Sequence, residues 1–329
     1  MNKIELLKKG TSEIVTEAES EKLLEGNSKA YIGFEPSGLP HIATLLWVNK
    51  LNDLVDLNID VTVLLADWHA MVNDKLDGDL NKIIESGNFF KKAMLASGLS
   101  ERVKFVWAHD LVSSSDYWGL LLKIAKASSL SRIRRSLPIM GRTEDDADKD
   151  FSKYIYPLMQ VTDVFYLDSD FALGGTDQRH AYMLARDIAE KMERKKPVLI
   201  EGPLISSLKG TGRMDNFKKM SKSSPDSAMF LNDNNDDIKR KIKNAFCPMG
   251  ITENNPIIDI FKYIIFPYYK TEITINRPES HGGPFTVKSF EELNKLYLNS
   301  KIHPVDLKNA VSDILIEIIS PISIKLKSD

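Results

Sequence analysis

The sequence contains one cysteine, no long apolar run and almost no net charge, and each of these features limits what the chain can be. Because Cys247 is alone, an internal disulfide and a cysteine-rich zinc site are excluded. No apolar stretch approaches the roughly 20 residues of a membrane-spanning helix, and the charged segment 1–9 does not resemble a secretory signal. We therefore expect a cytoplasmic protein with no membrane segment.

The formal net charge of −2 gives no overall sign of a nucleic-acid partner, so such a contact would depend on local clusters. Arg132, Arg134 and Arg135 cover more than one face of an expected helix, which favours contact with phosphates. The basic group at 191–196 is better explained as a solvated helix face. The length of 329 residues and the hydrophobic content of 43% suit a globular protein of two domains.

Alternating strand and helix patterns predict a doubly wound, Rossmann-like α/β domain with a parallel sheet. Buried strands are expected at the apolar runs 30–34, 61–66 and 103–107. Helical patterns cover 3–25, 42–57, 81–97, 111–136 and 176–193. Ligands of such sheets bind beyond the carboxyl ends of the strands, and the segments 31–41 and 66–69 fall there.

The character of the sequence changes after about residue 235. Short helical segments are interrupted by Pro248, Pro256, Pro267 and Pro278, and a last helix is expected at 304–319. We interpret this part as a smaller helical domain. The predicted boundary places a catalytic domain at 1–230 and the helical domain at 231–329.

Two separated motifs indicate a nucleotide site. The segment Lys219-Met220-Ser221-Lys222-Ser223, in an expected loop, combines flexible positive charges with hydroxyl donors that suit a polyphosphate clamp. Upstream, a Gly/Pro-rich turn at 36–40 leads to His41 at the start of an expected helix, whose free N–H groups attract phosphate. Gly33 and Gly38 allow close approach of the backbone. An isolated histidine here would more often be a packed helix cap, but the lysine loop favours the nucleotide interpretation.

A third motif indicates an amino-acid ligand. Tyr156, Gln160 and Asp163 recur at spacings of four and three, which places them on one face of a helix. Their apolar neighbours argue against an exposed face, and a buried polar face is costly unless it binds something. A fourth motif is a Gly174-Gly175 turn followed by Asp177, which suits the hydroxyls of a ribose. Asp177 is also a plausible helix N-cap.

In this order the four motifs resemble those of class I aminoacyl-tRNA synthetases. The 41–44 segment resembles their HIGH element, and 219–223 matches their KMSKS element at every position. The segments 31–38, 65–70, 156–160 and 174–179 resemble tyrosyl-tRNA synthetases of the archaeal and eukaryotic type, and 303–308 resembles the start of their anticodon-recognition helix. The resemblance covers nearly the whole chain. One departure is that Ala43 replaces the glycine, and Thr44 the second histidine, of the HIGH element, which puts the affinity for ATP in question.

The resemblance implies a role for each matching position. Pyrophosphate would be stabilised by His41, Lys219 and Lys222, assisted by Mg²⁺ that enters with ATP. The ATP site would comprise Gly33, His41, Gly175, Asp177, Lys219, Ser221, Lys222 and Ser223. The tyrosine ammonium and backbone would contact Tyr156, Gln160 and Gln178, and the phenol would lie between Tyr31 and Asp163. The tRNA would contact Arg132, Arg134, Arg135, Arg179, His303 and Asp306. No residue is assigned as a metal ligand. Family members are usually homodimers, with the interface in an insertion at about 111–150, near 111–130.

Three alternatives stay open on the residues. A tryptophanyl-tRNA synthetase shares the fold and both nucleotide motifs, although Tyr31 with Asp163 suits a phenol better than an indole. A retired synthetase that binds RNA without catalysis is supported only by Ala43 and Thr44. A nucleotidyltransferase of the same fold leaves residues 235–329 unexplained. We therefore predict an ATP-dependent ligase that joins L-tyrosine to its tRNA.

Overall fold

The computed structural model describes residues 2–210, 220 and 225–328, and the chain forms two compact units. The first unit comprises Met1–Gly38, Lys50–Lys91 and Leu99–Pro203, and the second comprises Leu39–Asn49, Lys92–Gly98 and Leu204–Asp329. This division differs from the predicted boundary after residue 230, because segments that are distant in the sequence pack into the same unit. The assignment of functions to two domains stays a prediction.

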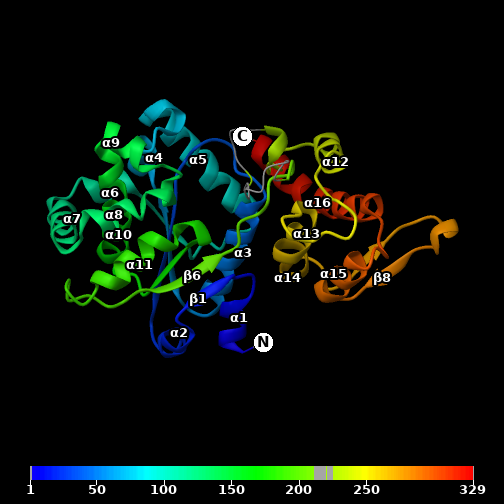
Figure 1. The fold of residues 1–329 in the computed structure, drawn as a ribbon, viewed down its shortest axis with the longest axis horizontal. Coiled ribbons are helices and arrows are strands. Elements are labelled where there is room, and N and C mark those ends of the chain that lie inside the picture. Colours follow the sequence, from blue (N-terminus) through cyan, green and yellow to red (C-terminus); the bar gives the residue numbers. More distant parts are fainter. Residues whose placement is uncertain (1, 211–219, 221–224, 329) are drawn as a thin grey trace. The chain divides into compact units, whose positions relative to one another are not determined.

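A six-stranded sheet forms the centre of the first unit (Figure 1). In spatial order its strands are β1 (Glu13–Val15), β6 (Val198–Gly202), β5 (Phe171–Gly175), β2 (Lys29–Phe34), β3 (Asp60–Leu65) and β4 (Lys104–Trp107). All neighbouring pairs are parallel except β1 and β6. The doubly wound α/β class is therefore confirmed. The core strands are apolar because helices cover both faces of such sheets.

The amino-terminal segment corrects one prediction. Residues 3–25 contain the expected helices α1 (Lys3–Lys8) and α2 (Glu17–Leu23), whose N-termini carry capping boxes. Between them, however, β1 pairs in antiparallel register with β6, Ile14 opposite Ile200. The strand conformation of β1 depends on this long-range pairing, which a local helical pattern does not contain.

Helices and turns connect the strands. From residue 43 to residue 96 they are α3 (Ala43–Asp56), α4 (Asp67–Val72), η1 (Lys75–Gly78) and α5 (Leu80–Ala96). From residue 108 to residue 149 they are α6 (Ala108–Val112), α7 (Ser115–Ala127), α8 (Leu130–Arg134), η2 (Leu137–Met140) and α9 (Glu144–Lys149). They are followed by α10 (Ser152–Tyr166), η3 (Thr176–Gln178) and α11 (Arg179–Ile188).

Helix α10 is the central helix of the first unit. It packs against α4, α7 and α11, and Figure 1 shows it between α7 and α11. Every side chain from Tyr156 to Phe165 is buried. The helix therefore carries its polar side chains into the interior, where each needs a partner.

The second unit is mostly helical, as predicted for its larger part. After η4 (Pro225–Ser227) its elements are α12 (Asn235–Lys243), α13 (Pro256–Ile260), η5 (Phe261–Ile265), α14 (Phe266–Tyr268), β7 (Ile273–Ile275), η6 (Glu279–His281), β8 (Phe285–Val287), α15 (Phe290–Leu298) and α16 (Pro304–Lys327). The small β7–β8 sheet is antiparallel, and it was not predicted. Helix α16 extends beyond the predicted end at 319. None of the helices within the described ranges is long and apolar enough to cross a membrane.

Candidate active site

The predicted pair Tyr31 and Asp163 lies in the interior of the first unit. The side chain of Asp163, on α10, is 1% exposed, and its Oδ2 accepts a hydrogen bond of 3.4 Å from the hydroxyl of Tyr31, on β2. The Tyr117 hydroxyl donates to Oδ1 at 2.8 Å, and Nε2 of His69 lies 2.9 Å from Oδ2. We call Asp163, its two hydroxyl donors and its ion-pair partner His69 the Asp163 cluster. A buried carboxylate is stable only with such partners.

Burial and charge fix the protonation of the cluster. Burial raises the pKa of Tyr31 and Tyr117 well above the usual value, and the Asp163 charge raises both further, so both phenols stay protonated donors. Burial alone lowers the pKa of His69, but the Asp163 carboxylate outweighs it and the net pKa is raised. The cluster therefore favours the protonated imidazole of His69 beside Asp163.

Two members of the cluster were not predicted as site residues. His69 lies in the 65–70 segment that carried part of the family resemblance, so a signal for it was present. Tyr117 belongs to α7 and gave no signal, because its contact with Asp163 joins residues 46 positions apart. Only the packing of α7 on α10 brings them together.

The amides predicted to hold the ammonium group also lie together. Nε2 of Gln160 donates to Oε1 of Gln178 at 3.2 Å, and Nε2 of Gln178 donates to the carbonyl of Ile139 at 2.8 Å. We call this series the amide chain. Its end, Oε1 of Gln160, is buried and has no hydrogen-bond partner among the described residues. An acceptor of this kind suits a cationic ligand.

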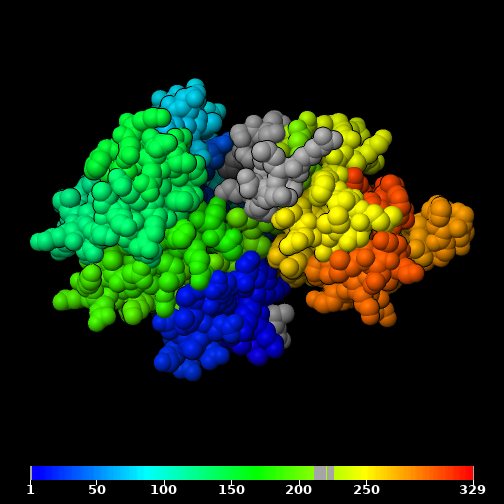
Figure 2. All heavy atoms as spheres, in the orientation of Figure 1, coloured from blue at the N-terminus to red at the C-terminus, as the bar shows by residue number. Residues whose placement is uncertain are grey.

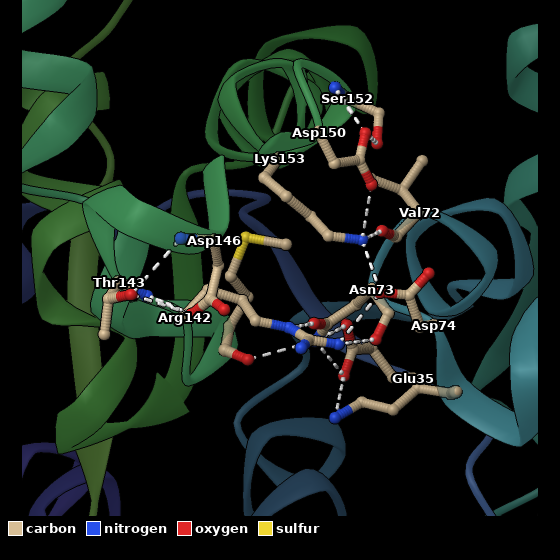
Figure 3. A network of polar contacts seen from close by, with 12 residues as sticks. Glu35, Val72, Asn73, Asp74, Arg142, Thr143, Asp146, Asp150, Ser152 and Lys153 are labelled. Carbon is tan, nitrogen blue, oxygen red and sulfur yellow. Dashed lines mark hydrogen bonds and ion pairs between the residues drawn. The ribbon is translucent and has the colours of Figure 1, made fainter. Parts of the chain in front are cut away.

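Tyr156, the third predicted ammonium contact, joins a separate group. Its hydroxyl donates to Oε1 of Glu35 at 2.8 Å, and burial together with this carboxylate raises the pKa of Tyr156 well above the usual value. Nδ2 of Asn73 donates to both Glu35 oxygens, at 2.9 and 3.3 Å (Figure 3). Glu35 and Asn73 were not predicted as site residues. Glu35 follows β2 directly, where ligand contacts are expected.

The residues assigned to ATP have local roles of their own. A Cβ at Gly33 would lie 2.8 Å from the Tyr31 hydroxyl, so glycine makes room for that side chain. Gly175 ends β5, and Asp177 lies within η3. The prediction of Asp177 as a helix N-cap is wrong, because η3 precedes α11 and Gln178 occupies its N-cap position.

His41, assigned to pyrophosphate, precedes α3 in the second unit. Its Nδ1 accepts a hydrogen bond of 3.3 Å from the amide of Ala43, and the residue forms a β-bridge with Phe230. The capping role expected of an isolated histidine is therefore present, and it leaves a ligand role open. Lys219, Ser221, Lys222 and Ser223 lie outside the described residues.

The predicted tRNA contacts are mostly engaged in ion pairs. Arg132 pairs with Asp187, and Arg134 lies 3.6 Å from Glu144. Arg179 contacts Glu13 at 2.6 Å and Glu201 at 2.8 Å. Burial lowers the pKa of Arg179, but the two carboxylates more than compensate and raise it. Arg135 is exposed. A phosphate would compete with carboxylates at the paired sites.

The two predicted tRNA contacts in the second unit lie at the start of α16. His303 is its N-cap, and its Nδ1 accepts from the amide of Val305 at 3.2 Å. Asp306 lies in the first turn, where the helix dipole stabilises a negative charge. The expected helix start is confirmed, whereas a contact with tRNA stays a prediction.

Comparisons with known proteins agree on one family. A family model described as tRNA synthetases class I (W and Y) matches residues 23–320. The tyrosine–tRNA ligase of Picrophilus torridus is 66% identical over 330 residues, covering 100% of each chain. The crystal structure of tyrosyl-tRNA synthetase from Aeropyrum pernix has 46% identity and a TM-score of 0.89, covering 98% of this chain and 93% of that one. A tyrosyl-tRNA synthetase from Archaeoglobus fulgidus, complexed with L-tyrosine, has 37% identity and a TM-score of 0.89, covering 98% of each. The chain therefore belongs to the class I tRNA synthetases for tryptophan and tyrosine, and within them to the tyrosine–tRNA ligases.

Proposed function

We propose that the chain activates L-tyrosine with ATP and transfers it to tRNA(Tyr). In the first step a tyrosine carboxylate oxygen bonds to the α-phosphorus of ATP, the bond to the β-phosphate oxygen breaks, and pyrophosphate leaves. In the second step a hydroxyl of the terminal ribose of tRNA attacks the carbonyl carbon, and AMP leaves. Neither step needs a nucleophile from the enzyme, so catalysis rests on positioning and charge stabilisation.

The observation that carries the choice of tyrosine is the Asp163 cluster. Its carboxylate is held by two hydroxyl donors and the ion-pair partner His69, on separate elements, and it can accept a further bond from a substrate hydroxyl. We assign the substrate phenol to a position beside Tyr31 and Asp163. Phenylalanine has no hydroxyl to donate to this buried carboxylate, a loss that hydrogen-bonding sites penalise strongly. Tyrosyl-tRNA synthetases are themselves the general example of this effect.

The ammonium group of tyrosine is assigned to the amide chain and Tyr156. Oε1 of Gln160 offers a buried acceptor, and Gln178 orients it. The Glu35 carboxylate, held by the Tyr156 hydroxyl, adds a negative charge to this end. Together these groups would hold the cation while the substrate carboxylate faces ATP.

The remaining assignments follow the family motifs. Adenosine is assigned to Gly33, Gly175 and Asp177, and the phosphates to His41 with 219–223. ATP would enter with Mg²⁺ bound to its phosphates, which neutralises charge that develops on the leaving pyrophosphate. The tRNA is assigned to Arg132, Arg134, Arg135, Arg179, His303 and Asp306. A cytoplasmic location follows from the role in translation.

A homodimer that uses α7 and α8 accompanies this function. Trp118, Leu122 and Leu130 are 38%, 67% and 54% exposed, which is unusual for large apolar side chains on neighbouring helices. Figure 2 shows this part of the chain, in teal to green, as a broad exposed surface of the first unit. Analytical ultracentrifugation of the whole protein at micromolar concentration measures its oligomeric state, and a monomer would contradict the proposal.

The function is tested by ATP–pyrophosphate exchange with each of the twenty amino acids in turn. Exchange with tyrosine alone is the expected result. Exchange with tryptophan instead would keep the family and overturn the assignment of the phenol. Silence with all twenty would favour a retired synthetase and direct attention to Ala43 and Thr44.

A further inference from the structure

Two consecutive backbone carbonyls accept hydrogen bonds from side chains of the proposed amino-acid site or of its neighbours. They belong to η2, the turn that follows helix α8 and ends at Gly141. The carbonyl of Ile139 accepts from Nε2 of Gln178 at 2.8 Å, and the carbonyl of Met140 accepts from Nδ2 of Asn73 at 3.1 Å. Neither carbonyl belongs to a residue with an assigned role in binding.

A carbonyl can only accept hydrogen bonds, and this fixes the direction of the amide chain. Because the Ile139 carbonyl faces Gln178, the NH₂ group of Gln178 must point to it and the amide oxygen must point away. That oxygen meets the NH₂ group of Gln160. Each amide in the amide chain therefore fixes the orientation of the next. The Gln160 oxygen is left as the last acceptor, buried and without a partner among the described residues.

The Asn73 amide is fixed in the same manner from two sides. Nε of Arg142, which can only donate, contacts Oδ1 of Asn73 at 3.0 Å. The NH₂ group of Asn73 must therefore face Glu35 and the Met140 carbonyl, both of which only accept. Glu35 in turn accepts from the Tyr156 hydroxyl. Figure 3 shows Arg142 directed at Asn73, with Glu35 beside it.

Arg142 and Lys153 also hold the backbone that carries Asn73. Arg142 donates through Nη2 to the carbonyl of Asn73 at 2.9 Å, and the buried ammonium of Lys153 contacts the Val72 carbonyl and, at 2.7 Å, Asp74 (Figure 3). Asp74 has a φ of 53°, in the left-handed region. Such a backbone is costly for a residue with a Cβ, so these two cations stabilise an unfavourable turn.

We propose that residues 137–142, the positioning turn, set the polarity of the amides that recognise the ammonium group of tyrosine. The turn acts on Gln160 through Ile139 and Gln178, and on Tyr156 through Met140, Arg142, Asn73 and Glu35. It touches no substrate in this role. The inference rests on the proposed assignment of the ammonium group, and it adds the element on which that assignment depends.

The test compares two ligands that differ only in the ammonium group. Titration calorimetry measures Kd for L-tyrosine and for 3-(4-hydroxyphenyl)propanoate, which lacks it. Gly141→Ala is the main variant, because Gly141 closes the turn with a φ of 73°, while an added Cβ would meet nothing within 4 Å. The quantity compared is the affinity for L-tyrosine divided by the affinity for the propanoate. In Gly141→Ala we expect this ratio to fall about tenfold or more, as for loss of a hydrogen bond to a charged group. The affinity for the propanoate should not change.

A matched control separates this effect from a general loss of stability. Gly98 has a φ of 90°, and a Cβ added there would also meet nothing within 4 Å. Gly98→Ala therefore imposes the same kind of backbone strain in the second unit, and its ratio should equal that of the unmodified protein. An equal fall in both alanine variants would overturn the proposal.

A second variant keeps the test valid if Gly141→Ala does not fold. Asn73→Asp preserves size but removes the donor to Glu35 and to the Met140 carbonyl, so the ratio should fall again. Asn52→Asp is its control, because Oδ1 of Asn52 accepts from the Ser100 amide at 2.9 Å and aspartate retains that acceptor. A ratio that is unchanged in Asn73→Asp would contradict the role of Asn73.

Gln160→Met distinguishes the inference from the proposed function. If this variant leaves the ratio unchanged, the ammonium assignment itself is wrong and the inference falls with it. If Gln160→Met lowers the ratio but Gly141→Ala and Asn73→Asp do not, the assignment stands and the positioning turn is overturned.

Discussion

The two ends of the proposed tyrosine site provide partners for their buried polar groups in different ways. At the phenol end, the charged Asp163 is satisfied by side chains from β2, α4 and α7. At the ammonium end, neutral amides form a directed series that starts at a backbone carbonyl. The first arrangement depends on charge, and the second depends on direction.

This difference predicts different responses to mutation. Removing a buried charge leaves its donors unpaired, which is costly in a medium of low polarity. Removing one amide breaks a series of neutral hydrogen bonds, each of which contributes only about 0.5–1.5 kcal/mol. We therefore expect the largest losses of activity at the phenol end.

The strongest test of the comparison is Asp163→Ala. The substrate hydroxyl and His69 would both lose their carboxylate partner, so we expect tyrosine-dependent pyrophosphate exchange to fall by at least about 10³-fold, the range seen when a dedicated hydrogen-bonding group is lost. Circular dichroism and binding of ATP serve as controls for folding. A near-normal rate with tyrosine would mean that the phenol is recognised elsewhere.

Part of each end could be predicted from the sequence. The spacing of Tyr156, Gln160 and Asp163 placed them on one helix face, and their burial on α10 confirms that the face is internal. The spacing works because it reflects the period of a single helix. It does not reveal which residues on other elements meet that face.

The site residues that the sequence did not predict are those that contact residues of other helices or strands. Tyr117 reaches Asp163 from α7, and Asn73 reaches Glu35 from the end of α4. The same reason explains β1, which becomes a strand by pairing with β6. Contacts between distant segments arise from packing, which a local pattern does not contain. The direction of the amide chain also needs coordinates, because it depends on the Ile139 carbonyl.

Tyr117→Phe asks whether the donors around Asp163 can be removed singly. The change deletes the 2.8 Å hydrogen bond to Oδ1 of Asp163, and that buried oxygen loses its donor. The free energy of unfolding should therefore fall by about 1–3 kcal/mol. We expect KM for tyrosine to rise by about tenfold, because the carboxylate is less firmly held. Thermal unfolding and pyrophosphate exchange measure the two effects.

The control for this variant is Tyr154→Phe, which removes another tyrosine–aspartate bond of the same unit, 2.5 Å to Oδ1 of Asp148. Its KM for tyrosine should stay unchanged. Equal rises of KM in both variants would show that the effect of Tyr117 is not specific to the Asp163 cluster.

The smallest expected effect concerns the pH dependence of stability. The folded-state pKa of His69 is raised above the unfolded value of roughly 6.5, because the Asp163 carboxylate, with Glu35 and Asp67, outweighs the opposing effect of burial. Protonated His69 therefore contributes stability that is fully present below the unfolded pKa and is lost as pH rises through the folded pKa. The difference in Tm between the unmodified protein and His69→Gln should be largest below about pH 6 and should narrow at higher pH. His180→Gln, at an exposed histidine of the same unit, is the control for the substitution itself. A difference that widens with pH would mean that His69 is neutral in the fold, and the phenol end would then depend on hydrogen-bond direction, as the ammonium end does.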